Sequence, residues 1–143
     1  MGARREGREA AVQFLYQRDL NAGASTETVE AFWALRPANS KVRAFGMDIA
    51  EGVLAHQGDI DERIRQAASN YDLHRIAAVD RNILRIAIFE MLFCPDVPPV
   101  VSINEAIEIA KRFGSDESGR FVNGVLDRIR GELNRPARAA KTE

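Results

Sequence analysis

Residues 79–93 read VDRNILRIAIFEMLF, and this stretch indicates how the other elements of the chain must pack. Drawn as a helix it is apolar on almost every side, and past its first turn only Arg85 and Glu90 carry a charge. A helix that is apolar all round is buried inside a protein. The stretch therefore predicts a central helix, ended by Cys94 and Pro95 and enclosed by other elements.

Amphipathic helical spacing recurs on both sides of this stretch, and the alternation typical of strands never persists. Towards the N-terminus it predicts helices over residues 4–20, 25–35, 40–57 and from 59 towards 71, with Ser25, Ser40 and Asp59 as N-caps and Gly58 ending the third. Towards the C-terminus it predicts a helix opened by a Ser102 and Glu105 capping box and ended at Gly114, and a last helix, N-capped by Ser115 or Ser118, that runs to Leu133. The predicted fold class is all-α, a compact bundle of about seven helices.

The 143 residues carry 20 basic and 21 acidic side chains, which predicts one domain. We expect it to span residues 1–133, followed by a flexible C-terminal tail over 134–143 that lacks apolar periodicity. No stretch without a charged residue exceeds eight residues, far short of the roughly 20 that cross a membrane. The N-terminus has no apolar segment of the signal-peptide kind, and there is a single cysteine, so the sequence favours the cytoplasm.

Catalytic and metal-binding patterns are missing from the sequence. His56, His74 and Cys94 are too few for a closed structural zinc site, and no acid pair or nucleophile has a context that marks it for catalysis. Residues 114–119 have the glycine spacing of a phosphate-binding loop, but Arg120 and Phe121 stand where that loop needs Lys and Ser or Thr. We expect neither an enzyme nor a cofactor.

Two basic segments suggest binding to a polyanion. Arg4, Arg5 and Arg8 fall on the first two turns of the first helix at spacings that share one face, although Glu6 and Glu9 weaken the patch. Residues 1–20 and 111–143 together hold twelve basic and eight acidic side chains, whereas residues 21–110 hold eight basic and thirteen acidic. If the fold brings the two ends together, one face becomes basic.

The second segment interleaves bases with aromatic rings. Lys111 and Arg112 precede Phe113, and Arg120 precedes Phe121. Single-stranded RNA needs this combination, because cations meet its phosphates and rings stack on its bases. Phe113 falls on the apolar stripe of its helix and is expected in the core. The residues alone leave RNA binding open beside a plain protein-interaction bundle.

Three stretches carry a resemblance to a known family. They are the Arg-rich start followed by AAVQFLYQ, then AVDRNILRIAIFEML, and then the long ungapped DVPPVVSINEAIEIAKRFGSDESGRFVNGVLDRI. Together they resemble the NusB family of bacterial transcription antitermination factors over most of residues 4–133. The resemblance implies a helical domain of two small helical subdomains, without enzyme activity, that binds boxA RNA together with the ribosomal protein NusE. It also implies assembly with RNA polymerase and other Nus factors to support ribosomal RNA transcription.

Residue roles follow from the same resemblance, position by position. Tyr16 and Asp80 match positions that hold NusE, and Asp80 is expected to face outward from the start of its helix. Glu6 departs from the base that relatives commonly have, which implies weaker RNA affinity. Alternatives are an RNA-binding domain like that of some ribosomal RNA methyltransferases, or a dimerisation module without RNA binding; family members occur as monomers and homodimers. The positions that match RNA-facing ones are Arg4, Arg5, Arg8, Lys111, Arg112, Arg120 and Phe121.

Overall fold

The computed structural model describes residues 2–20, 27–68 and 72–133. Over these residues the chain forms seven α-helices and one short 3₁₀ helix, and no strand, so the predicted all-α class is confirmed. None of the described helices is long and apolar enough to cross a bilayer. The elements are α1 (Ala3–Leu20), α2 (Glu27–Leu35), α3 (Ser40–Ala55), α4 (Gln57–Ala67), η1 (Leu73–Arg75), α5 (Ala78–Phe93), α6 (Pro99–Phe113) and α7 (Ser118–Glu132).

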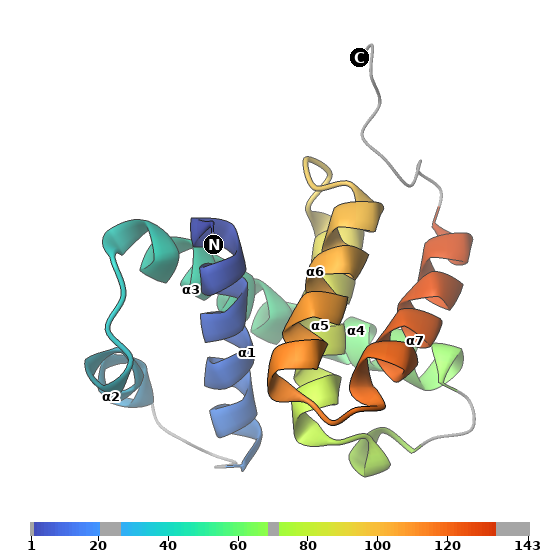
Figure 1. Ribbon diagram of the computed structural model, residues 1–143, viewed down its shortest axis with the longest axis horizontal. Coiled ribbons are helices and arrows are strands. Elements are labelled where there is room, and N and C mark those ends of the chain that lie inside the picture. The colour runs from blue at the N-terminus through green and yellow to red at the C-terminus, as the bar shows by residue number, and fades with distance from the viewer. Residues whose placement is uncertain (1, 21–26, 69–71, 134–143) are drawn as a thin grey trace.

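The helices form two groups, with α1 to α3 on one side of Figure 1 and α4 to α7 on the other. Helix α5 packs against both groups, contacting α1 and α3 as well as α4, α6 and α7. Its side chains at Ile83, Leu84 and Ile88 are at most 1% exposed, so the predicted central helix is confirmed. A single apolar core runs through both groups.

Helices α3 and α4 differ from their predicted bounds. Asn39, not Ser40, caps α3, because its side-chain oxygen accepts a 2.9 Å hydrogen bond from the backbone N–H of Val42. His56 alone separates α3 from α4, and Gly58 lies inside α4 instead of ending α3. The predicted N-cap Ser25 and the predicted tail over residues 134–143 lie outside the described residues.

The predicted capping box at Ser102 is wrong. Helix α6 starts three residues earlier, at Pro99, whose fixed φ and missing N–H suit a first helical position. Ser102 is consequently inside the helix, 1% exposed, and its hydroxyl has no hydrogen-bond partner among the described residues. The Glu105 carboxylate is used elsewhere, as an acceptor for Arg5.

Glycines allow two close approaches of the backbone. A Cβ on Gly46 of α3 would lie 2.9 Å from the carbonyl oxygen of Gly7 on α1, and one on Gly7 would lie 2.7 Å from the Phe45 ring. Gly7 is therefore needed for helix crossing, which sequence reasoning missed. Gly114 ends α6 as predicted, and the Ser118 hydroxyl accepts a 2.9 Å hydrogen bond from the backbone N–H of Ser115 in the turn that follows.

Candidate RNA and partner surface

Arg8 lies inside the protein, not on a basic face. Its guanidinium donates to both carboxylate oxygens of Glu90 on α5, with Nη2 at 2.9 Å from Oε2, and the two side chains are 4% and 2% exposed. A charge this enclosed needs its partner, since an unpaired buried ion is strongly unfavourable. The expectation that Arg8 shares a solvent-facing patch with Arg4 and Arg5 is therefore incorrect.

Arg5 is half-buried and also committed to a partner. Its Nε and Nη2 atoms donate to the two oxygens of Glu105 on α6, each at 2.8 Å. This hydrogen bonding, together with the attraction between the two charges, raises the pKa of Arg5. The hydrogen bond from Arg5 and the charges of Arg5 and Arg8 also lower the pKa of Glu105, against the effect of partial burial. The pair thus joins α1 to α6.

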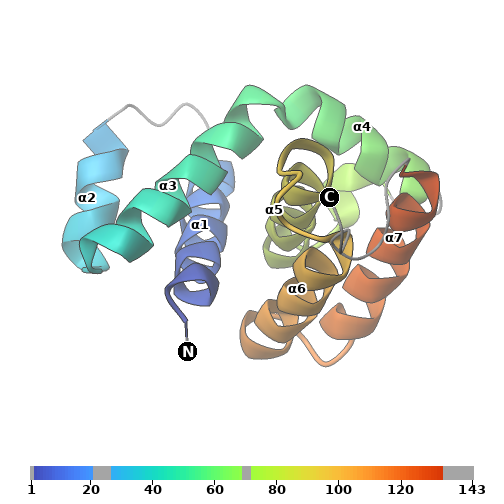
Figure 2. The same ribbon diagram turned by 90° about the horizontal axis from the view of Figure 1, so that it is seen from above.

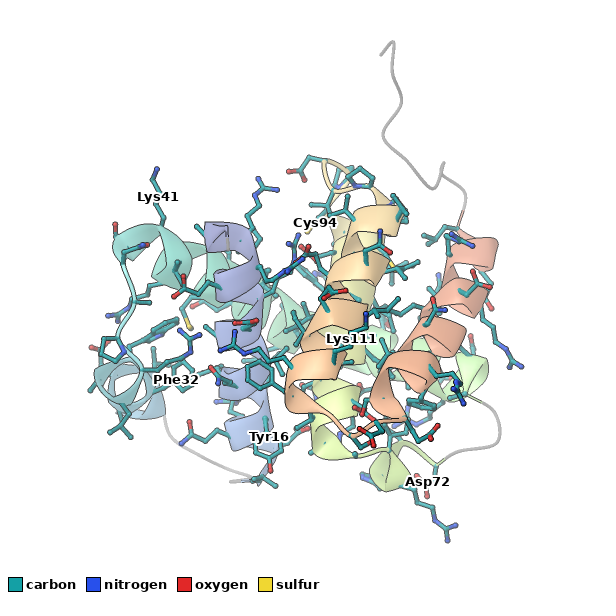
Figure 3. The ribbon with its side chains drawn as sticks, viewed as in Figure 1. Tyr16, Phe32, Lys41, Asp72, Cys94 and Lys111 are labelled. Carbon is teal, nitrogen blue, oxygen red and sulfur yellow. The ribbon has the colours of Figure 1, made fainter. Side chains whose placement is uncertain are left out.

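Arg4 is the residue of the N-terminal trio that stays exposed. Its guanidinium carbon lies 5.4 Å from the centre of the Phe45 ring on α3, a cation–π distance. Lys41, one helical turn before Phe45, is also exposed, and Figure 3 shows it projecting from the same end of the molecule as the start of α1. No pattern in the sequence marks Lys41 or Phe45 as part of a binding site.

Arg112 is held in place by a buried carboxylate on α1. Its Nη1 donates to both oxygens of Glu9 at 3.0 and 3.1 Å, while its guanidinium carbon lies 5.3 Å from the centre of the Phe113 ring. Glu9 is 3% exposed, whereas the Arg112 side chain is 56% exposed and keeps much of its surface in solvent. Lys111 beside it is exposed and makes one 3.4 Å contact with Glu108. Phe113 packs against the core, as predicted.

Arg120 and Phe121 open α7, directly after the turn that follows α6. Arg120 is more open than Lys111 or Arg112, with its side chain 87% exposed and, among the described residues, a single 3.6 Å ion pair, to Glu117. Phe121 is half-buried, packing partly on the core and lining a surface pocket. Contacts between Glu9 and Arg112 bring this region against α1. We call these four exposed cations and the half-buried ring, which come from both helix groups, the cationic face: Arg4, Lys111, Arg112, Arg120 and Phe121.

Asp80 does not face outward as expected. It is 8% exposed, and its Oδ1 atom has no hydrogen-bond partner among the described residues. It lines a pocket of about 180 Å³ together with Phe121 of α7, with Glu117 just before α7, and with residues 75–77. The packing of α7 beside the start of α5 encloses it, which its own helix could not reveal. The structure therefore joins one residue assigned to RNA with one assigned to the protein partner.

Tyr16 lies near the end of α1, 36% exposed, at the same end of the molecule as Asp72 and the start of α5 (Figure 3).

Asp19 joins the end of α1 to the first half of α5. Its Oδ2 atom accepts hydrogen bonds from Arg81 at 3.1 and 3.2 Å, from Asn82 at 3.0 Å and from Arg85 at 2.8 Å. The helical spacing of apolar side chains does not predict these hydrogen bonds to Asp19.

Arg85 continues the network to α4, donating to both oxygens of Asp61 at 2.8 and 3.1 Å. Burial of the guanidinium acts to lower the pKa of Arg85, but the hydrogen bond and charge of Asp61, with those of Asp19, outweigh burial and raise it. One of the two charges inside the central stretch thus links α5 to two other helices. The described residues contain no group of three metal-ligating side chains.

Comparisons with known proteins agree with this architecture. A model of the NusB family matches residues 5–130. The transcription antitermination protein NusB of Myxococcus xanthus is 44% identical over 140 residues, covering 95% of this chain and all of that protein. The structure of T. maritima NusB superposes with a TM-score of 0.82 at 35% identity, over 92% of this chain and 93% of that one.

A further structure, described as antitermination factors NusB and NusE in complex with dsRNA, has the same fold, with a TM-score of 0.83 at 24% identity over 93% of this chain and 99% of that one. The all-helical fold of the described residues and its exposed cations define a small helical binding protein. The family match and the full-length relatives specify the kind: the chain belongs to the NusB family of transcription antitermination proteins.

Proposed function

We propose that this protein binds boxA RNA together with the ribosomal protein NusE and so supports transcription of ribosomal RNA through terminators, in a complex with RNA polymerase and other Nus factors. Family membership over residues 5–130 supports the antitermination role. The observation that carries RNA binding is the cationic face, where four exposed cations accompany one half-buried ring. Such a protein works as a cytoplasmic binding factor, not as an enzyme.

The roles of the seven RNA-site residues divide by burial. Exposed Arg4, Lys111 and Arg120 can meet phosphates without giving up a strong partner, because their ion pairs are long or absent from the described contacts. Arg112 offers the outer edge of a guanidinium that Glu9 fixes from behind. Phe121 supplies the ring for base stacking. Half-buried Arg5 and buried Arg8 act as positioning residues for α1, because their guanidinium groups are paired with Glu105 and Glu90.

The partner surface that we propose for NusE is the end of the molecule that carries Tyr16 and Asp80. Tyr16 is exposed, and Asp80 lines a surface pocket with a carboxylate oxygen that has no hydrogen-bond partner among the described residues. A basic ribosomal protein can satisfy that oxygen with a cationic or N–H donor. Because Asp80 shares a pocket with Phe121, NusE and RNA would meet at adjoining sites, which favours cooperative binding.

Cooperativity is also what tests the proposal. Fluorescence anisotropy of labelled boxA RNA, titrated with this protein in the presence and absence of NusE, should give a dissociation constant at least tenfold lower with NusE, or about 1.4 kcal/mol. A scrambled RNA of equal length serves as the control. Equal affinities with and without NusE would favour the alternative, a NusB-like RNA-binding or dimerisation module that acts without antitermination.

A further inference from the structure

A second surface lies away from the cationic face, on α4 and the C-terminal end of α5. Here a groove of about 430 Å³ is open to solvent. It combines an aromatic ring, an aliphatic side chain and two carboxylates, and the proposed binding of RNA and NusE uses none of them. The residues that line it are Asp59, Glu62, Arg63, Gln66, Leu92 and Phe93.

Phe93 is the aromatic wall of this groove. It is 39% exposed, which is unusual in a chain whose other phenylalanines are buried or half-buried over the described residues. His56 stacks on it from the junction of α3 and α4, with the ring centres 3.9 Å apart and the planes 17° from parallel. Phe89 supports the ring from the preceding turn of α5, at 5.7 Å. The ring is therefore fixed in position while part of it remains open to a ligand.

The charge of the groove is negative. Asp59 and Glu62 lie one turn apart on α4, and both are exposed. The one cation of the lining, Arg63, lies 3.4 Å from Glu132 on α7, which neutralises it. Glu62 also accepts two 3.3 to 3.4 Å hydrogen bonds, from Arg65 and Gln66, but such exposed contacts are weak and exchange readily with a ligand.

We propose that this groove binds an arginine side chain presented by a peptide segment of another protein. A guanidinium can stack on the Phe93 ring while its N–H groups donate to the carboxylates of Glu62 and Asp59, and its aliphatic stem can lie along Leu92. Lysine is a poorer ligand, because an ammonium neither stacks flat nor forks to two oxygens. Two exposed carboxylates repel the phosphates of RNA, which favours a protein segment over RNA as the occupant.

The groove is spatially separate from the cationic face. Residues 94–98 connect α5 to α6, so Phe93 lies near the start of α6, whereas Lys111 and Arg112 lie near its end. Fifteen helical residues span about 22 Å. In Figure 2, α4 lies along the upper edge of the molecule, while the start of α1 and the body of α6 lie along the lower edge. Both surfaces can be occupied at once.

The test uses the full chain, labelled with ¹⁵N, and two blocked peptides that differ in one residue type, acetyl-Ala-Arg-Leu-Arg-Ala-amide and its lysine counterpart. The arginine peptide should shift amide signals of α4 and of the end of α5 saturably, and bind at least fivefold more tightly than the lysine peptide. Phe93→Leu and Glu62→Gln should each weaken binding about fivefold, equivalent to one cation–π or exposed charge contact. Glu51→Gln, at an exposed carboxylate outside the groove, is the matched control.

Three results would overturn the inference: equal affinity for both peptides, shifts that follow the cationic face, or loss of binding in the control variant alone. A chain shortened after Leu133 provides a further check, since residues 134–143 contain Arg135 and Arg138. If that chain binds the arginine peptide much more tightly than the full chain does, the protein's own C-terminus competes for the groove and the assignment to another protein is wrong. Affinity for boxA RNA, measured in parallel, should be the same in Phe93→Leu and wild type.

Discussion

The guanidinium of Arg8 on α1 and the carboxylate of Glu90 on α5 face each other inside the protein, joined by three hydrogen bonds of 2.9 to 3.2 Å. The pair connects the two helix groups at a point that solvent barely reaches. Two charged residues that look, in the sequence, like an RNA contact and an interruption of an apolar helix are therefore each other's partner.

Removing one member of this pair should unfold the protein more readily. Arg8→Met leaves the Glu90 carboxylate buried without a countercharge, and we expect the free energy of unfolding to fall by about 3–5 kcal/mol. Urea denaturation followed by circular dichroism measures it. The double variant Arg8→Met, Glu90→Met should recover most of that loss. A stable Arg8→Met protein that binds RNA poorly would instead make Arg8 a direct RNA contact.

Acid should weaken the contact between Arg5 and Glu105. The folded state lowers the pKa of Glu105 from its ordinary value of 4.5, so the folded protein binds fewer protons there than the unfolded chain. The resulting stability is complete above about pH 4.5 and is lost as the pH falls through the lower folded-state value. Wild type should therefore be more stable than Glu105→Gln at pH 7, and the two stability curves should converge as the pH falls below about 4.5. Parallel curves would contradict this assignment.

Salt should weaken RNA binding through the exposed cations. For single strands the logarithm of the binding constant falls by about 0.7 per neutralised phosphate for each unit of log salt, so replacing Arg4, Lys111 and Arg120 together with Ala should flatten the slope by about two units. RNA titrations at several salt concentrations measure it. Arg130→Ala, which removes an exposed cation at the other end of α7, should keep the wild-type slope. An unchanged slope in the triple variant would remove these residues from the RNA site.

Phe121 should contribute through its ring, not only through its bulk. Base stacking on an aromatic side chain contributes roughly 1–3 kcal/mol, so Phe121→Leu should weaken boxA binding by about five- to a hundredfold. Because Leu retains apolar packing against the core, the melting temperature of Phe121→Leu should stay near that of wild type. Phe121→Ala should lower both the melting temperature and the affinity for boxA RNA. Equal RNA affinity of the Leu variant and wild type would assign Phe121 to packing alone.

Asp80 should matter for NusE and not for folding. Asp80→Asn keeps the shape of the side chain and removes the charge, so we expect affinity for NusE to fall by about 2 kcal/mol or more, roughly thirtyfold, with RNA affinity in the absence of NusE not reduced. Titration of labelled NusE measures it. Asp80→Lys is unsuitable, since a residue only 8% exposed would bury an ammonium and destabilise the fold. Unchanged NusE affinity in Asp80→Asn would leave Asp80 a helix-end residue.

Local patterns in the sequence were sufficient for the fold and insufficient for the site. Apolar spacing indicates the amphipathic helices, because periodicity reports which side of a helix is buried. Residues 79–93 are identified as the central helix because they are apolar on almost every side. Caps were less predictable: Asn39 and not Ser40 caps α3, and α6 begins at Pro99 instead of after Ser102.

The fate of each charge could not be predicted locally. Arg4 and Arg8 look equivalent one turn apart, yet one is exposed and the other meets Glu90, 82 positions along the chain. The burial of Asp80 could not be predicted from α5 alone either, because it depends on the packing of α7. Pairings over such sequence separations depend on how helices pack, and no periodicity within one helix records them.

Because the cationic face is divided between the two helix groups, RNA binding would affect how firmly these groups stay together. Arg4 belongs to α1, whereas Lys111, Arg112, Arg120 and Phe121 belong to the opposite group, so a bound strand would span the seam and resist its opening. Binding that requires the docked arrangement adds its free energy to that arrangement by mass action. Bound RNA would then link the two helix groups. Motions that separate α1 from α6 would become slower when RNA binds and return to their former rate when it dissociates.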